Sequence, residues 1–362
     1  MIVDLIAGAR PNFMKVAAII RAIERRAADG GRLRYRLVHT GQHYDTNLSG
    51  AFFAQLGIPA PHVNLDVGSG TQAEQTAGIM TRYERVHDES RPDACVVVGD
   101  VTSTMACAIV ARKQGTPVAH VEAGIRSGDW SMPEEINRIV TDALSHWHFT
   151  TSEIANENLR RAGVEASRIH FVGNTMIDTL LANMDRLVAP PAWQELGLEE
   201  RAYFVLTLHR PANVGLLPNL VRLLSAVAQC ARELPVVFPA HPRTVKVLDG
   251  NSVPPNVHII EPQPYLEFNY LVRHAKAAIT DSGGITEEAT VMGVPCMTLR
   301  STTERPETVT IGTNELLGTD ASAIGPSFER LFAGAWKKGG IPPKWDGKSA
   351  ERIVAVLEAS LG

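Results

Sequence analysis

The feature of this chain that most constrains its fold is a regular alternation of short apolar segments with longer amphipathic segments. In the first half, apolar segments at residues 2–7, 35–40, 94–98 and 117–121 are followed by polar or glycine-containing loops. Segments with helical periodicity, such as residues 103–113, separate them. Strands that alternate with helices form parallel sheets with helices on both faces. The sequence therefore predicts an α/β fold.

The alternation stops once and then restarts. Residues 188–200 contain adjacent prolines and predict a linker, after which apolar segments recur. A chain of 362 residues is long enough for two domains, each with its own core. We therefore expect two doubly wound parallel-sheet (Rossmann-like) domains facing a cleft, at residues 1–188 and 201–345. We expect a C-terminal helix in residues 346–362 to pack back on the first domain.

Composition and charge exclude several classes of protein. Hydrophobic residues make up 44% and charged residues 20% of the chain, as in ordinary soluble globular proteins. A net charge of −4 argues against a nucleic-acid or anionic-membrane binder, because such proteins need a basic surface. The four cysteines show no metal-binding spacing and fit buried positions in a reducing compartment. The N-terminus lacks a basic region typical of a signal peptide, so we expect a cytoplasmic protein.

Polar side chains follow most of the predicted strands. In open parallel sheets, ligands bind at the carboxyl ends of the strands, so these side chains predict the functional edge of each sheet. One polar residue after a strand is common turn chemistry, but a His, Asp or Arg after most strands indicates a site. The residues are Arg10, His43, Asp100 and Glu122 in the first half, and His209, Arg210, His241, Arg243, Asp281, Ser282 and the segment 303–307 in the second.

The stretch from residue 120 to 138 carries many charges between a buried strand and a predicted helix. Burying charges is costly unless they are paired, solvated or used. Asp100, Glu122 and Glu134 are carboxylates on one predicted rim, and paired acids suit general acid–base catalysis. A solvated loop followed by a helix that begins at a proline explains the stretch equally well. The sequence of this stretch leaves both interpretations open.

The segment Asp281-Ser282-Gly283-Gly284 is the best candidate for binding a phosphate. Its glycines let the backbone approach a ligand, and the predicted helix after it presents unpaired N–H groups. An ordinary helix cap is the alternative interpretation. Glu287 and Glu288, which we place in the first turn of that helix, would repel a phosphate unless one accepts hydroxyl hydrogen bonds, as from a ribose. The chain contains no Walker A or dinucleotide-binding motif in the proper context and no metal-ligand spacing, so we expect no metal.

Seven motifs in order make the chain resemble the non-hydrolysing UDP-N-acetylglucosamine 2-epimerase family. They read GARPNFMK, VVVGDVTST, HVEAGIRSGDWSMPEEINR, FVGNTMIDTL, LTLHRPANV, ITDSGGITEEA and STTERPETVTIGT, and they extend from residue 8 to about residue 313. The resemblance implies a fold like that of GT-B glycosyltransferases, with a UDP-sugar between the two domains. It also implies a homodimer.

The resemblance also assigns residues to roles. By the family's pattern, UDP would be bound by Arg10, His209, Ser282, Gly283, Gly284 and Glu288, with Arg243 and Arg305 as further candidates. Glu288 would accept hydrogen bonds from the ribose. The catalytic acids and their supporting residues would be Lys15, Asp100, Glu122, Glu134 and His209.

The reaction that the resemblance implies is reversible C2 epimerisation of a UDP-2-acetamido sugar, from UDP-GlcNAc to UDP-ManNAc. UDP leaves C1 and the C2 proton is removed, which gives a 2-acetamidoglucal; re-addition with protonation on the other face inverts C2. Two faces require two acid–base groups, and departure of the diphosphate requires Arg, His and N–H donors. No metal or redox cofactor is needed.

Several alternatives stay open at this point. A hydrolysing epimerase that releases UDP and ManNAc, a GT-B glycosyltransferase that uses a UDP-sugar donor, and a non-catalytic UDP-sugar sensor would share these motifs. The chain also departs from the family, because many bacterial members read GTRPE where this chain has Ala9 and Asn12. Residues 42–45 differ from the segment of allosterically activated members, so we do not expect activation by a second UDP-GlcNAc. The sequences GARP and HYD also resemble family members that act on modified sugars.

Overall fold

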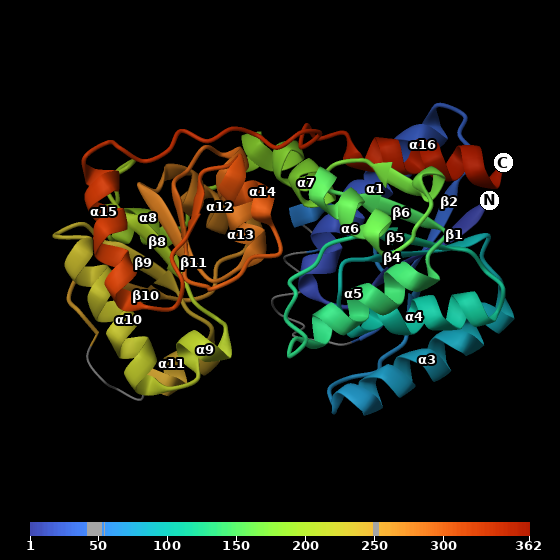
Figure 1. Cartoon of the computed structure of the whole chain (residues 1–362), viewed down its shortest axis with the longest axis horizontal. Helices are drawn as coiled ribbons and strands as arrows, with labels where there is room; N and C mark the ends of the chain where they lie inside the picture. Colours follow the sequence, from blue (N-terminus) through green and yellow to red (C-terminus); the bar gives the residue numbers. More distant parts are fainter. Residues whose placement is uncertain (42–52, 54, 249–252) are drawn as a thin grey trace. The chain divides into compact units, whose positions relative to one another are not determined.

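The computed structural model describes residues 1–41, 53, 55–248 and 253–362, and for residues 10, 11 and 211 it describes the backbone only. His43, the segment 42–45 and the side chain of Arg10 therefore lie outside the described residues. The chain divides into two compact units. Unit 1 comprises residues 1–182 and 343–362, and unit 2 comprises residues 183–342 (Figure 1).

Unit 1 contains a seven-stranded parallel sheet with the strand order β3-β2-β1-β4-β5-β6-β7. The strand order reverses between β1 and β4, which are hydrogen-bonded neighbours. All five residues of β4 are buried, as the apolar sequence at 94–98 predicts. The strands are β1 (Ile2–Ala7), β2 (Arg34–His39), β3 (Val63–Asn64), β4 (Ala94–Val98), β5 (Val118–Val121), β6 (Trp147–Thr150) and β7 (Ile169–Phe171).

The helices of unit 1 alternate with its strands. Helix α1 begins at the first residue after the Gly8-Ala9 turn, with a proline among its first two residues, where a missing N–H costs nothing. The helices are α1 (Arg10–Ala28), α3 (Gln72–Glu89), α4 (Thr102–Lys113), α5 (Pro133–Leu144), α6 (Glu153–Arg161), α7 (Thr175–Asn183, whose last residue lies in unit 2) and α16 (Ser349–Leu361).

Unit 2 contains a six-stranded parallel sheet with the order β10-β9-β8-β11-β12-β13. Here the strand order reverses between β8 and β11. The prediction of two doubly wound parallel sheets is therefore confirmed. The strands are β8 (Phe204–Thr207), β9 (Val236–Pro239), β10 (Val257–Ile260), β11 (Ala277–Thr280), β12 (Cys296–Thr298) and β13 (Asn314–Leu316).

The helices of unit 2 pack around this sheet. The core between the sheet and helices α10 and α15 is built mainly from aliphatic residues together with Phe204, Phe238 and Phe328. The rings of Phe204 and Phe328 lie 4.8 Å apart. Residues 188–200, which we expected as a linker, include a short helix whose Trp193 packs edge-on against Tyr203 and Tyr270 of this unit. The helices are α8 (Pro191–Glu195), α9 (Pro211–Val214), α10 (Leu217–Cys230), α11 (Pro242–Leu248), α12 (Tyr265–His274), α13 (Gly283–Val291), α14 (Pro306–Thr310) and α15 (Ile324–Phe332).

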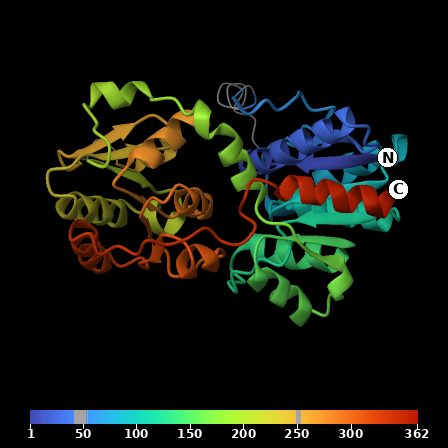
Figure 2. The same cartoon turned by 90° about the horizontal axis from the view of Figure 1, so that it is seen from above.

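The C-terminal helix α16 belongs to unit 1, where it packs on α1 (Figure 2). The carboxylate of Asp178, on α7, accepts a 2.7 Å hydrogen bond from the backbone N–H of Ala350 in the first turn of α16. Trp345 is buried, and its indole N–H donates to the Thr151 carbonyl at 3.0 Å. These contacts attach the end of the chain to unit 1.

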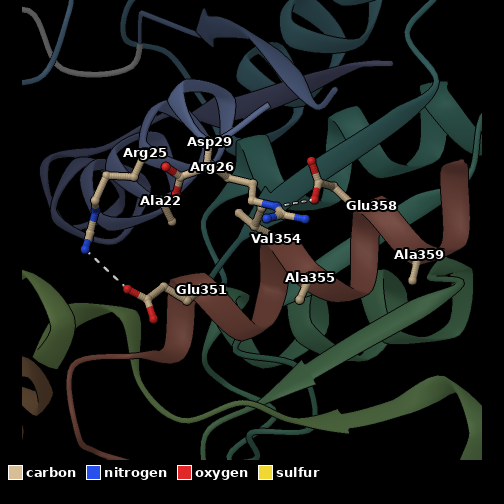
Figure 3. Close-up of a pocket in the computed structure, with 9 residues that line it drawn as sticks. All are labelled: Ala22, Arg25, Arg26, Asp29, Glu351, Val354, Ala355, Glu358 and Ala359. Carbon is tan, nitrogen blue, oxygen red and sulfur yellow. Dashed lines mark hydrogen bonds and ion pairs between the residues drawn. The ribbon is translucent and has the colours of Figure 1, made fainter. Parts of the chain in front are cut away.

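A groove of about 770 Å³ separates the outer faces of α1 and α16 (Figure 3). Its charged side chains pair across it, as Arg25 with Glu351 at 3.2 Å and Arg26 with Glu358 at 2.8 Å. None of the residues that line it is a predicted site residue, so the groove marks the packing of the last helix rather than a substrate site. Over the described part of the chain, the helices are all too short or too polar to cross a lipid bilayer.

Replacing Asp178 with Ala removes the acceptor for an otherwise unpaired N–H at the start of α16. Loss of such a cap costs about 1 kcal/mol, within a range of roughly 0.5–2 kcal/mol. We expect faster amide hydrogen exchange confined to α16, measured by mass spectrometry. Asp178→Asn is the matched control, because its amide oxygen can still accept the hydrogen bond. Equal protection of α16 in the two variants would contradict this role.

Candidate active site

The predicted site residues follow strands at, or next to, the point where the strand order of each sheet reverses. In unit 1 this point lies between β1 and β4, and in unit 2 between β8 and β11. The connections after two such strands diverge to opposite sides of the sheet, which leaves room for a ligand at their carboxyl ends.

In unit 1, Lys15 on α1 pairs with Glu122, the residue that follows β5. The distance from Lys15 Nζ to Glu122 Oε2 is 2.6 Å, and both side chains are buried. Glu122 has a φ of +70°, a left-handed conformation that is unusual for a residue with a side chain. Such a conformation costs on the order of 1–3 kcal/mol and persists only where the surroundings enforce it, often at functional sites. The Glu122 N–H donates to the Phe149 carbonyl at 2.9 Å, which helps to hold this conformation.

Gly99, directly after β4, lies beneath this ion pair. Its φ is +71°, and a Cβ atom placed there would lie 3.3 Å from Lys15 Nζ and 3.4 Å from Asn12 Nδ2. Asn12 donates from Nδ2 to the Val98 carbonyl at 2.8 Å and accepts at Oδ1 from the Ala9 N–H at 3.0 Å. An ionised glutamate could not donate to Val98. The asparagine that distinguishes this chain from GTRPE sequences therefore ties the loop after β1 to the end of β4.

Asp100 is held by two residues of helix α5. Arg138 donates from Nε and Nη2 to Asp100 Oδ2 at 3.1 and 2.5 Å, and Asn137 donates to the Asp100 carbonyl at 2.8 Å. Glu134 lies one turn before Arg138 on the same helix face, is half-buried, and has no hydrogen-bond partner among the described residues. Glu134 and Asp100 are thus brought to the same face of α5.

Glu135 is directed into the loop that precedes α5. It accepts hydrogen bonds from the N–H and hydroxyl of Ser127, both at 2.9 Å, and pairs with Arg138 at 2.7 Å. Burial alone would raise the pKa of Glu135, but the Ser127 N–H and the Arg138 guanidinium outweigh burial and lower it. The arginine therefore connects an ionised structural carboxylate to Asp100.

His120, in β5, links helix α5 to the loop after β4. Its Nδ1 lies 2.7 Å from Asp142 Oδ1, and its Nε2 lies 2.8 Å from the Gly99 carbonyl. Asp142 also pairs with Arg126 at 2.6 Å. Burial would raise the pKa of Asp142, but the charges and hydrogen bonds of His120 and Arg126 lower it. Both ring nitrogens of His120 are therefore engaged within unit 1.

In unit 2, His209 after β8 contacts Asp281 after β11. The distance from His209 Nδ1 to Asp281 Oδ1 is 2.7 Å. Asp281 is fully buried, whereas the His209 side chain is 57% exposed. Burial would raise the pKa of Asp281, but the hydrogen bond and charge of His209, with donors from Asn213 and Arg210, lower it. Asp281 is therefore an ionised anchor beneath an exposed imidazole.

Ser282 and Gly283 form the start of helix α13. The Ser282 side chain makes no capping hydrogen bond to the described residues of the helix, whose first N–H groups lack partners within the helix. A Cβ atom added at Gly283 would meet no described heavy atom within 4 Å. Gly284 follows in the same turn. This open helix N-terminus can hold an anion through N–H groups and the helix dipole.

The two glutamates of α13 are not in its first turn, so that part of the prediction is wrong. The helix begins at Gly283, which puts Glu287 and Glu288 in the second turn. Glu287 pairs with Arg305, and both are buried. Glu288 is buried as well, and burial raises its pKa to about 7. Neither carboxylate competes with an anion for the first N–H groups of the helix.

Arg210 and Arg243 also follow strands of the unit 2 sheet, at the carboxyl ends of those strands. Arg243 is exposed on α11, which follows β9, the neighbour of β8. Arg210 Nη2 lies 3.6 Å from Glu304, and Glu304 accepts two 2.7 Å hydrogen bonds from Arg300. These pairs connect the loops after β8 and β12.

Asn12 and Arg138 were not assigned a site role from the sequence, and Asp281 was placed at a strand end without its contact to His209. That contact could have been found from strand order, because His209 and Asp281 follow adjacent strands of the sheet. Arg138 could have been found from helix periodicity, since it lies one turn after Glu134. Asn12 gave a signal only as a departure from the family's usual glutamate.

Replacing Lys15 with Met would remove the Lys15 ammonium from the buried Glu122 carboxylate. Breaking a buried pair in this way costs about 3–5 kcal/mol, whereas removing both charges costs less. We therefore expect Lys15→Met with Glu122→Gln to be more stable than Lys15→Met alone, measured by urea denaturation. The exposed pair of Arg25 and Glu351 serves as the control, and Glu351→Gln should change stability little. Strict additivity of the two buried substitutions would contradict the coupling.

Comparison with known proteins identifies the family. Residues 25–358 match the family model described as UDP-N-acetylglucosamine 2-epimerase. A UDP-N-acetylglucosamine 2-epimerase of Methanocaldococcus jannaschii is 40% identical, over 99% of this chain and 99% of its own. A UDP-2,3-diacetamido-2,3-dideoxy-D-glucuronate 2-epimerase of Pseudomonas aeruginosa is also 40% identical, over 88% of this chain and 89% of its own.

Solved structures agree with the sequence comparison. The crystal structure of Methanocaldococcus jannaschii UDP-GlcNAc 2-epimerase in complex with UDP-GlcNAc and UDP matches with a TM-score of 0.88 and 39% identity, over 99% of this chain and 100% of that one. The glycosyltransferase SnogD from Streptomyces nogalater matches with a TM-score of 0.54 and 17% identity over all of both chains, which shows a shared fold and confirms the GT-B-like class. The resemblance read from the seven motifs is confirmed: the chain belongs to the UDP-N-acetylglucosamine 2-epimerase family.

Proposed function

We propose that this protein catalyses the reversible C2 epimerisation of a UDP-2-acetamido sugar, UDP-GlcNAc to UDP-ManNAc, without hydrolysis. Family membership supports the reaction class. The observation that carries the proposal is that the two units bear different kinds of chemical group. Unit 1 gathers the carboxylates of Asp100, Glu122 and Glu134, and unit 2 offers an exposed histidine beside an open helix N-terminus.

The carboxylates of unit 1 suit proton transfer at C2. The C2 hydrogen of the sugar becomes removable as UDP departs from C1, because C1 becomes electron-poor. One group removes this proton, and a second group protonates the resulting 2-acetamidoglucal on the opposite face. Asp100 and Glu122 are the main candidates, each held in place by a cation, and Glu134 adds a carboxyl group on the same helix face as Arg138.

The groups of unit 2 suit binding of UDP and stabilisation of its departure. The N–H groups at Ser282, Gly283 and Gly284 would bind the diphosphate, and His209 would donate to it as negative charge develops. Glu288 would accept hydrogen bonds from the ribose hydroxyls. Arg10, Arg243 and Arg305 are further candidates for contacts with UDP. In this proposal the reaction uses acid–base chemistry alone and needs no metal or redox cofactor.

The sugar specificity of the protein is a separate question. The relative from Pseudomonas aeruginosa is named for a 2,3-diacetamido glucuronate substrate and is as similar to this chain as the relative named for UDP-GlcNAc. We propose UDP-GlcNAc as substrate and test both sugars. We also propose a homodimer, which light scattering coupled to size-exclusion chromatography would test.

An NMR assay in deuterated water tests the reaction. With UDP-GlcNAc alone, we expect deuterium at C2 of sugars that remain attached to UDP, together with the C2 epimer. The same assay with the 2,3-diacetamido glucuronate analogue compares the two sugars. Accumulation of free ManNAc would instead indicate a hydrolysing enzyme, and a strict requirement for an acceptor would indicate a glycosyltransferase. Binding of UDP-GlcNAc without exchange at C2 would indicate a sensor.

Replacing Asp100 with Asn tests the role of its carboxylate. Loss of a general acid–base group costs roughly 10²–10⁴-fold in rate, so we expect kcat to fall by this factor while the fold persists. Asp93→Asn is a matched control at the opposite end of β4, where Asp93 accepts a 2.6 Å hydrogen bond from the Ile2 N–H. The control should retain activity. An Asp100→Asn variant as active as the control would contradict the assignment.

A further inference from the structure

The chain contains the same histidine–aspartate contact in each unit, in two different settings. In unit 1, His120 is buried and its Nε2 faces the Gly99 carbonyl at 2.8 Å. In unit 2, the His209 side chain is 57% exposed, and its Nδ1 lies 2.7 Å from a buried aspartate. The unit 1 pair is therefore structural, whereas the unit 2 pair leaves one face of its imidazole accessible.

The carboxylate of Asp281 is surrounded by donors. Its oxygens accept from the backbone N–H groups of His209, at 3.1 Å, and Arg210, at 3.0 Å, and from Asn213 Nδ2 at 2.9 Å. The backbone positions are set by the neighbouring strands, since Thr280 of β11 pairs with Thr207 of β8. Asp281 therefore holds both the loop and the ring of His209.

The chemistry of this contact determines where the ring carries a proton. An ionised carboxylate can only accept hydrogen bonds. His209 Nδ1 must therefore carry a hydrogen to bond with Asp281, and Nε2 is left as the ring nitrogen that can exchange a proton or bind a ligand. The lowered pKa of Asp281, which results because the donors around it outweigh its burial, supports an ionised carboxylate at neutral pH.

We propose that Asp281 is a positioning residue that keeps the proton of the neutral His209 ring on Nδ1 and presents Nε2 to the ligand. The effect on turnover rests on the proposed function, in which His209 acts on the departing diphosphate. The effect on the position of the ring proton does not depend on the proposed function. An aspartate that orients a catalytic imidazole through Nδ1 is a known arrangement in other enzymes, where exchanging it for asparagine fixes the wrong tautomer.

The variant Asp281→Asn gives a specific prediction because of the donors around this residue. The Oδ2 position faces the Arg210 N–H, which cannot turn, and Asn213, whose Nδ2 also donates to the Leu299 carbonyl at 3.2 Å. The new amide oxygen should take this position. Its NH₂ group then faces His209 Nδ1, which must become an acceptor, and the ring proton moves to Nε2.

The experiment is ¹⁵N NMR of the full-length protein labelled at histidine, at a pH where the rings are neutral. The nitrogen shifts distinguish a protonated ring nitrogen from one with a lone pair, and His209→Gln assigns the signals. We expect Nδ1–H in the wild type and Nε2–H in Asp281→Asn. Asn213→Ala removes a donor to the same carboxylate without touching the ring, and it should keep Nδ1–H.

Kinetics with UDP-GlcNAc complete the test. We expect kcat of Asp281→Asn to fall at least about 10²-fold, as for loss of one oriented donor, with a smaller change in KM. A wild-type ring with its proton on Nε2 would overturn the proposal, and that spectrum requires no variant to fold. An Asp281→Asn protein with an unchanged tautomer would overturn it as well. A wild type that does not turn over UDP-GlcNAc would refute the proposed function, and the spectra would still decide the role of Asp281.

Discussion

The structure depends on the pairing of two parallel strands at the point where each sheet reverses its order. In unit 1, β1 pairs with β4, and in unit 2, β8 pairs with β11. Because both strands of each pair end at the same edge, residues far apart in the chain meet without a long excursion of the backbone. His209 and Asp281, which follow β8 and β11, are 72 residues apart. Lys15 on α1 and Glu122, which follows β5 beside β4, are 107 residues apart. The chemistry of each unit follows from this pairing.

Several of the charges at these edges are held in pairs. Lys15 with Glu122 and Arg138 with Asp100 and Glu135 combine each carboxylate with a cation, as buried or half-buried charges require. The pairs limit the movement of side chains whose alignment with a substrate would matter. The left-handed backbone at Glu122 fits this pattern, since local strain is retained where surrounding contacts enforce it.

Much of this arrangement was predictable from the sequence, and the missing part has a physical cause. Asp100, Glu122 and His209 could be predicted as site residues because each follows an apolar segment, and an apolar segment that ends at a polar residue is a local sequence signal. The strands β3, β6 and β13 were missed, since they lack a continuous apolar sequence. The contacts Asp281–His209 and Arg138–Asp100 join residues of different elements, so they depend on strand order and on how α5 packs, which no local pattern contains. The glutamates of α13 were assigned to the wrong turn because the start of a helix is uncertain by a few residues in sequence.

The return of α16 to unit 1 has a consequence for the synthesis of the protein. Unit 2 is an insertion between residues 182 and 343 of unit 1, so two covalent connections join the units. On the ribosome, unit 2 is complete before the last 20 residues of unit 1 have been made. Unit 1 therefore cannot be completed until α16 has been synthesised. Until then, the surface of α1 that α16 covers stays uncovered. Loss of the last helix would leave the first unit incomplete while the second remained whole.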